Sequence, residues 1–138
     1  MNTPLPLSSN PLWLPQFMGS VHAGFPSPAT DYAQRRVDLL SRLKINEEAT
    51  YMFTVLGDSM IDDGIYNGNV LIIDRSVTPV HNAIVLAVID NEYAVKQLYK
   101  RGKVIKLLSE NKAYPPIELQ EGQELQIWGV VKGNLRIY

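Results

Sequence analysis

The sequence predicts a mainly β domain with a proline-rich segment in front of it. Between residues 51 and 131, short apolar runs of strand length alternate with glycine, asparagine and proline turns. In the first 30 residues there is no charged side chain, and six of the nine prolines of the chain fall there. Because proline lacks a backbone donor and fixes φ, this front segment is neither a regular helix nor a central strand.

A short helix is predicted between the front segment and the strands. It begins at Thr30 or Asp31, either of which can cap it, and ends at Leu43. An apolar stripe at helical spacing supports this prediction. The stripe consists of Ala33, Val37, Leu39 and Leu40.

The rest of the chain is predicted to form strands joined by tight turns. The runs 70–73 and 83–89 are apolar throughout, which is typical of strands that are buried on both faces or curl into a barrel. Asp90-Asn91 and Arg101-Gly102 are expected to form hairpin turns, and Gly129 a bulge or a close contact. The predicted strands are 51–56, 70–73, 83–89, 93–99, 104–108, 117–119 and 125–131.

Length and composition exclude several classes of protein. The 138 residues suit one domain with a real core, and the net charge of −1 argues against a dedicated nucleic-acid surface. With no cysteine in the chain, disulfides and thiolate metal sites are excluded, and a reducing cytoplasm is a suitable location. No apolar run approaches the roughly 20 residues of a membrane span. Neither a cofactor nor a metal ion is expected.

The segment Gly57-Asp58-Ser59-Met60 is the first of two features with chemical potential. Ser59 opens a short segment that Gly64 closes, which is the pattern of a one-turn helix with a serine at its N-cap. Capping is the usual role of such a serine. The alternative is a nucleophile, because free amides at the start of a helix suit the oxyanion of an acyl-transfer intermediate.

The second feature is Lys96, which strand alternation places on one face with Ala94 and Leu98. Such a lysine usually extends its amine to water at the rim of a sheet. If it is buried instead, its chemistry changes. Reaching the neutral amine from a pKa near 10.4 costs about 4.6 kcal/mol at pH 7, at about 1.36 kcal/mol per pKa unit. Burial can lower the pKa by about 3–5 units, which would make Lys96 a general base.

Taken together, these residues resemble the UmuD/LexA family of self-cleaving serine peptidases. The spacing of 37 residues from Ser59 to Lys96, and of 35 from Gly24 to Ser59, makes the resemblance specific. It implies a LexA/signal-peptidase-like fold of curled β-sheets with a short N-terminal helix and a flexible N-terminal arm. The matching stretches are Ala23-Gly24 with residues 25–29, Gly57 to Asp62, Gly68 to Ile72, Val95-Lys96, Ala113 to Ile117, and Gly129 to Val131.

The resemblance also implies roles for individual residues. Ser59 would be the nucleophile and Lys96 the general base, with the backbone amides of Asp58 and Ser59 as the oxyanion hole. The substrate would be the Ala23–Gly24 bond. The chain would then divide into a segment 1–23 removed by self-cleavage, an arm with a short helix (24–50), and a β-rich peptidase and dimerisation core (51–138).

Partners follow from the same resemblance. It implies a cytoplasmic homodimer whose cleavage is stimulated by a RecA filament on single-stranded DNA. The processed form would join a Y-family DNA polymerase in error-prone lesion bypass during the SOS response. The 23 uncharged, proline-rich residues before the cleavage site do not predict a DNA-binding domain, so the repressor function of the LexA type is not expected here. No direct contact with nucleic acid is expected, and the lack of a membrane span predicts none with a membrane. Two alternatives stay open: a non-catalytic β-rich docking module that regulates a polymerase, and a peptidase that acts on other proteins.

Overall fold

The computed structural model describes residues 5–6, 11–17, 20–21, 23–26, 34–118 and 125–138. The chain divides into two compact units, Met1–Leu7 with Asn46–Tyr138, and Ser8–Ile45. Within the described ranges, no helix combines the length and the apolar character that a membrane span needs.

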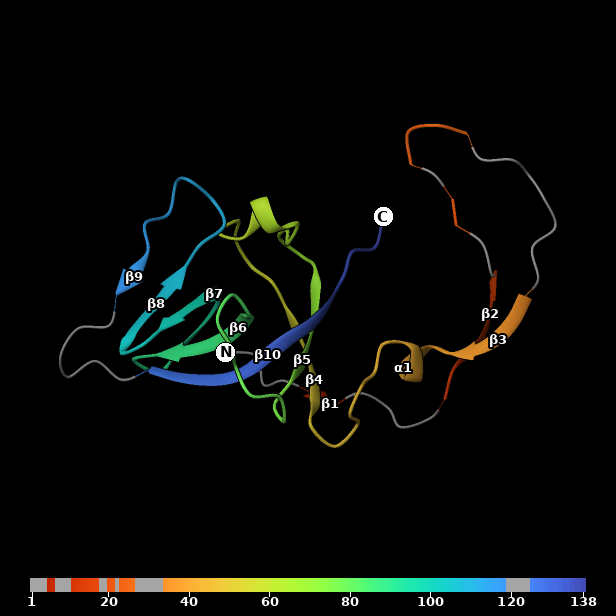
Figure 1. Ribbon diagram of the computed structural model, residues 1–138, viewed down its shortest axis with the longest axis horizontal. Helices are drawn as coiled ribbons and strands as arrows, with labels where there is room; N and C mark the ends of the chain where they lie inside the picture. Colours follow the sequence, from red (N-terminus) through yellow and green to blue (C-terminus); the bar gives the residue numbers. More distant parts are fainter. Residues whose placement is uncertain (1–4, 7–10, 18–19, 22, 27–33, 119–124) are drawn as a thin grey trace. The chain divides into compact units, whose positions relative to one another are not determined.

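The larger unit is an eight-stranded antiparallel sheet with the order β1-β4-β5-β10-β6-β7-β8-β9 (Figure 1). This architecture confirms the predicted mainly β class. Its elements are β1 (Leu5–Pro6), β4 (Thr50–Thr54), the 3-10 helix η1 (Ile61–Asp63), β5 (Val70–Asp74), β6 (Ile84–Ile89), β7 (Glu92–Arg101), β8 (Val104–Leu108), β9 (Ile117–Glu118) and β10 (Leu125–Leu135).

The long strand β10 joins the two halves of this sheet. Its first part pairs with β6 and its second part with β5, as the blue arrow in Figure 1 shows. The register of β10 shifts between Ile127 and Gly129 and again between Val131 and Gly133. The bulge predicted at Gly129 is therefore confirmed. Such irregularities bend and twist a strand, which lets β10 serve both halves.

Both faces of the sheet are buried. On β6, Leu86 belongs to one hydrophobic cluster, whereas its neighbours Val85 and Ala87 belong to another. Successive residues of a strand point to opposite faces, so the two clusters lie on opposite sides of β6. This burial explains the unbroken apolar run that the sequence shows there.

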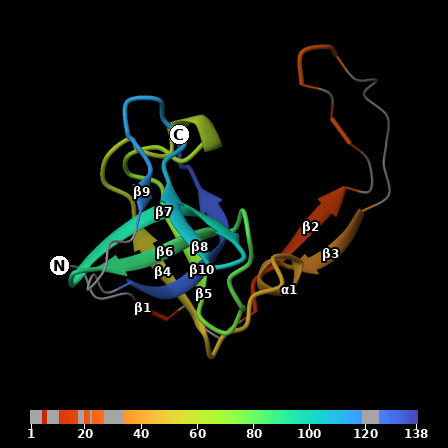
Figure 2. The same ribbon diagram turned by 60° about the vertical axis from the view of Figure 1, so that its left-hand side comes forward.

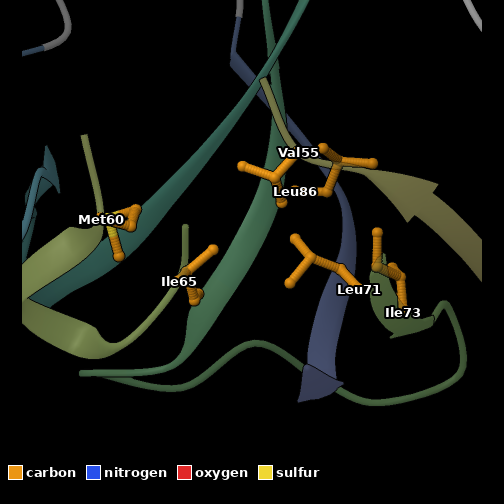
Figure 3. Close-up of a cluster of buried hydrophobic side chains, with 6 residues drawn as sticks. All are labelled: Val55, Met60, Ile65, Leu71, Ile73 and Leu86. Carbon is orange, nitrogen blue, oxygen red and sulfur yellow. The ribbon is translucent and has the colours of Figure 1, made fainter. Parts of the chain in front are cut away.

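The first cluster lies against the segment between β4 and β5. Figure 3 shows its members, Val55, Met60, Ile65, Leu71, Ile73 and Leu86. Met60 is only 2% exposed and Ile65 only 3%. These two side chains therefore anchor the turn that contains Ser59 to the sheet.

The smaller unit contains the hairpin of β2 (Trp13–Phe17) and β3 (Gln34–Asp38), followed by α1 (Leu39–Arg42) (Figure 2). The predicted helix is wrong over Gln34–Asp38, because these residues pair with β2 instead. The predicted start at Thr30 or Asp31 lies outside the described residues. Helix α1 is capped by Asp38, whose Oδ1 accepts from the backbone N–H of Leu40 at 3.3 Å.

The turns follow the sequence prediction closely. Asp90 and Asn91 have φ values of 48° and 68°, so the first hairpin has the predicted left-handed turn. The second turn lies one residue later than predicted. Arg101 pairs with Val104, which leaves Gly102 and the residue after it as the loop. The predicted strand end at residue 119 lies outside the described part of the chain.

Candidate active site

Ser59 and Lys96 line the same cavity of the larger unit, which has a volume of about 410 Å³. Residues 53–57, at the end of β4 and beyond it, form one part of the lining, and residues 92–96 of β7 form another. The fold thus brings together the two side chains that the sequence singled out. Most of the remaining lining is apolar.

The side chain of Ser59 does not cap the short helix. The N-cap of η1 is Met60, which makes no side-chain capping bond, so the predicted cap at Ser59 is wrong. Gly64 ends the helix with a φ of 79°, as its position in the sequence predicted. Among the described residues, the Ser59 hydroxyl has no hydrogen-bond partner. It is therefore available for chemistry.

Lys96 is a buried lysine, with 8% of its surface exposed. Burial lowers the pKa of its amine, because a charged group loses its hydration there. Within the described ranges, no carboxylate forms an ion pair with Lys96 to offset this effect. The structure therefore contradicts the view of Lys96 as a solvated lysine at a sheet rim.

The amine of Lys96 has a defined partner. Its Nζ donates a hydrogen bond of 2.8 Å to the hydroxyl of Ser109, the residue that follows β8. It also lies 5.6 Å from the centre of the Tyr114 ring. Sequence reasoning missed Ser109, although the hairpin of β7 and β8 contains the signal. Gln97 pairs with Leu108, so one more step of that register sets Lys96 opposite Ser109.

The segment 109–114 also holds the backbone before Ser59. Asn111 Nδ2 donates to the carbonyl oxygen of Asp58 at 2.8 Å, and the Tyr114 hydroxyl donates to Asp58 Oδ1 at 2.6 Å. The hydrogen bond to Asp58 and its charge raise the pKa of Tyr114. The peptide that links Asp58 to Ser59 is planar, so fixing its carbonyl also fixes the direction of the Ser59 N–H.

The predicted cleavage residues lie in the smaller unit. Ala23 and Gly24 are exposed and belong to the connection between β2 and β3. Gly24 has a φ of 101°, a conformation that side chains with a Cβ rarely adopt.

A metal centre finds no support in the part of the chain that the structure describes. No group of three or more histidine or acidic side chains is placed there to hold an ion.

Comparison with known proteins shows the family. The Peptidase S24-like family matches residues 15–132. Protein MucA of Salmonella typhimurium is 38% identical over 123 residues, which cover 88% of this chain and 84% of MucA. Protein ImpA of Escherichia coli is 45% identical over 87 residues, 63% of this chain and 60% of ImpA.

LexA repressor 2 of Pseudomonas putida is similar as well. It is 37% identical over 119 residues, which cover 86% of this chain and 58% of the repressor. These similarities confirm the resemblance predicted from the serine and lysine motifs. The chain belongs to the Peptidase S24-like family.

Proposed function

We propose that this chain is a serine peptidase that cleaves its own Ala23–Gly24 bond, with Ser59 as nucleophile and Lys96 as general base. The main support is the burial of Lys96 in the cavity that Ser59 also lines. A lysine accepts a proton from a serine only when its own amine is neutral, and burial favours the neutral amine. No histidine or metal ion is needed for this step.

The reaction proceeds in two stages. The neutral Lys96 amine takes the Ser59 proton while the Ser59 oxygen attacks the carbonyl carbon of Ala23. The backbone amides of Asp58 and Ser59 stabilise the oxyanion, and the bond to Gly24 breaks as Lys96 returns the proton to the leaving nitrogen. Water then hydrolyses the ester between Ala23 and Ser59, with Lys96 again serving as base.

The proposed biological role is that of the UmuD-type relatives. Cleavage would remove residues 1–23 and leave an arm (24–50) and a dimeric core (51–138). A RecA filament on single-stranded DNA would stimulate cleavage, and the processed dimer would join a Y-family DNA polymerase in the SOS response. Similarity to MucA over 88% of this chain supports this role.

The test is to incubate the purified chain between pH 7 and pH 10 and to follow its products by mass spectrometry. We expect a fragment that begins at Gly24, formed faster as pH rises. The reason is that the neutral fraction of Lys96 grows until pH exceeds its lowered pKa, above which the rate levels off.

Two variants serve as controls for this experiment. Ser59→Ala removes the nucleophile, and Lys96→Arg keeps the charge but cannot deprotonate, so neither variant should cleave. If the wild type gives no such fragment at any pH, with or without the RecA filament, the non-catalytic docking module is favoured. Cleavage of a separate peptide spanning residues 21–29 would support a peptidase that acts on other proteins.

A further inference from the structure

We propose that Ser109 is a positioning residue that holds the Lys96 amine in the orientation needed to deprotonate Ser59. This inference rests on the proposed function, and it adds a third residue to the serine and lysine. The primary observation is the hydrogen bond of 2.8 Å from Lys96 Nζ to Ser109 Oγ, inside a partly buried environment.

Among the residues that the structure describes, Ser109 is the only hydrogen-bond partner of the Lys96 amine. On β7, the neighbours on its own face are Ala94 and Leu98, and across the strand pair on β6 it faces Val85. All three are apolar. Since a lysine side chain has four rotatable bonds, an amine in such surroundings would sample several positions without an acceptor. Ser109 supplies that acceptor.

Ser109 is itself fixed relative to the turn that contains Ser59. The carbonyl oxygen of the neighbouring Glu110 accepts a hydrogen bond of 2.8 Å from the N–H of Asp62. The N–H of Glu110 donates to the sulfur of Met60 at 3.4 Å. Met60 directly follows Ser59 in the chain, and Asp62 lies two residues beyond Met60. The backbone around Ser109 therefore ties the position of the base to the position of the nucleophile.

The chemistry of an amine explains what this contact does. A neutral amine has two N–H bonds and one lone pair. Donating one N–H to Ser109 occupies one of the three staggered positions about the Cε–Nζ bond, so the lone pair is confined to the two that point away from Ser109. The same acceptor also favours the ammonium form, which has more protons to donate, and so it raises the pKa of Lys96 relative to a site without it.

Loss of Ser109 should thus have two separable effects. The cleavage rate at high pH, where Lys96 is neutral, should fall because the lone pair is no longer oriented. The midpoint of the pH profile should move to lower pH because the ammonium loses an acceptor.

The other titratable groups nearby are Glu92 in the cavity lining, Tyr114 beside the amine, Asp58 bonded to Tyr114, and Glu110. They are the same in every variant compared.

The experiment measures self-cleavage of the full chain against pH for the wild type, Ser109→Ala and Ser109→Thr. Lys112→Ala is the matched control, because Lys112 lies on the same segment and is exposed. We expect Ser109→Ala to lower the plateau rate by about 10- to 100-fold, the scale of a misplaced catalytic group, and to move the midpoint to lower pH. Ser109→Thr keeps the hydroxyl and should restore most of the rate. A plateau rate for Ser109→Ala equal to that of the wild type, or equal losses in both variants, would overturn the proposal.

A second measurement is independent of cleavage. In chains labelled with carbon-13 at lysine Cε, NMR follows the titration of Lys96 in Ser59→Ala with and without Ser109→Ala. The midpoint should be lower in the double variant, and an unchanged midpoint would rule out the contact. If the wild type does not cleave but this midpoint moves, the proposed function fails while the contact between Lys96 and Ser109 stands.

Discussion

Lys96 is buried within the sheet, although lysine side chains normally extend to water. Lys96 is 8% exposed and faces Val85, which is fully buried. Its pKa is lowered in the folded state, whereas the unfolded chain keeps the ordinary value of 10.5. Between these two values the unfolded state binds more protons, so stability rises with pH across that window. The general base that we propose therefore reduces the stability of the fold at neutral pH.

Replacing Lys96 by methionine should stabilise the protein at pH 7. Methionine has a similar length and no charge to desolvate, so we expect the melting temperature to rise by about 2–5 °C. The gain should shrink as pH approaches 10.5, where the wild-type amine is neutral in both states. Thermal unfolding followed by circular dichroism at several pH values measures it.

Lys100→Met is the matched control, because Lys100 lies on the same strand but is exposed. It should change the melting temperature little, and by the same amount at each pH. If Lys96→Met is no more stable than the wild type, or if its gain in melting temperature does not depend on pH, then burial of the amine does not reduce the stability of the fold.

The sequence located the two side chains of the proposed dyad but not Ser109, which contacts Lys96. Ser59 and Lys96 stand in motifs whose spacing can be read directly from the chain. Ser109 stands in no motif, and its role depends on the register of the hairpin formed by β7 and β8. The predicted turn at Arg101-Gly102 was displaced by one residue, and such a shift alters every cross-strand pair. Side-chain partners across a hairpin are therefore predictable only once the turn is fixed.

Among the elements, β3 shows where local pattern fails. Val37 and Leu40 have the spacing of a helical stripe, and Thr30 or Asp31 could cap a helix, so the segment suggested a longer helix. In the structure the cap is Asp38, and the helix begins at Leu39. Residues before it pair with β2, about 20 positions earlier in the chain. A pairing between strands so distant in the chain leaves no local signal in the sequence. Consecutive strands joined by a tight turn, such as β6 and β7, do leave one, because the turn residues mark the hairpin.

Strand β10 contains a glycine whose replacement should be costly. A Cβ on Gly129 would lie 2.5 Å from Ile73 Cγ2 and 3.3 Å from the backbone oxygen of Asp74. Ile73 is fully buried and β-branched, so its methyl group has little freedom to move away. We expect Gly129→Ala to lower the free energy of unfolding by about 1–3 kcal/mol, as overpacking of cores usually does. Denaturation in urea measures this loss.

Gly133→Ala provides the comparison on the same strand. Its Cβ would lie 3.5 Å from Ile72 Cδ1, an ordinary contact, so the cost should stay below about 1 kcal/mol. Equal losses for the two variants would indicate that backbone freedom, and not the contact with Ile73, explains the requirement for glycine at position 129.

At the scale of the whole molecule, residues 1–23 contribute one strand to each unit. Strand β1 is an edge strand of the larger unit and pairs with β4, and β2 pairs with β3 in the smaller one. The proposed cleavage site lies after both donated strands and before β3. Cleavage therefore leaves these strands without a covalent link to their partners, and a pairing that was intramolecular becomes bimolecular.

This arrangement predicts that cleavage frees two strand edges. An isolated two-stranded pair is marginally stable, and the pairing of β1 with β4 covers only Leu5 and Pro6, so the fragment should leave.

In a chain that begins at Gly24, we expect the amides of β3 to exchange hydrogen about tenfold faster than in full-length Ser59→Ala. Peptides from β4 should also lose protection, on the edge that β1 covered. Hydrogen exchange read by mass spectrometry makes the comparison, with β6 as the internal reference because both its neighbours remain in the shorter chain. Equal protection of β3 in the two chains would mean that residues 1–23 do not hold this strand, and the proposed exposure of new edges would be wrong.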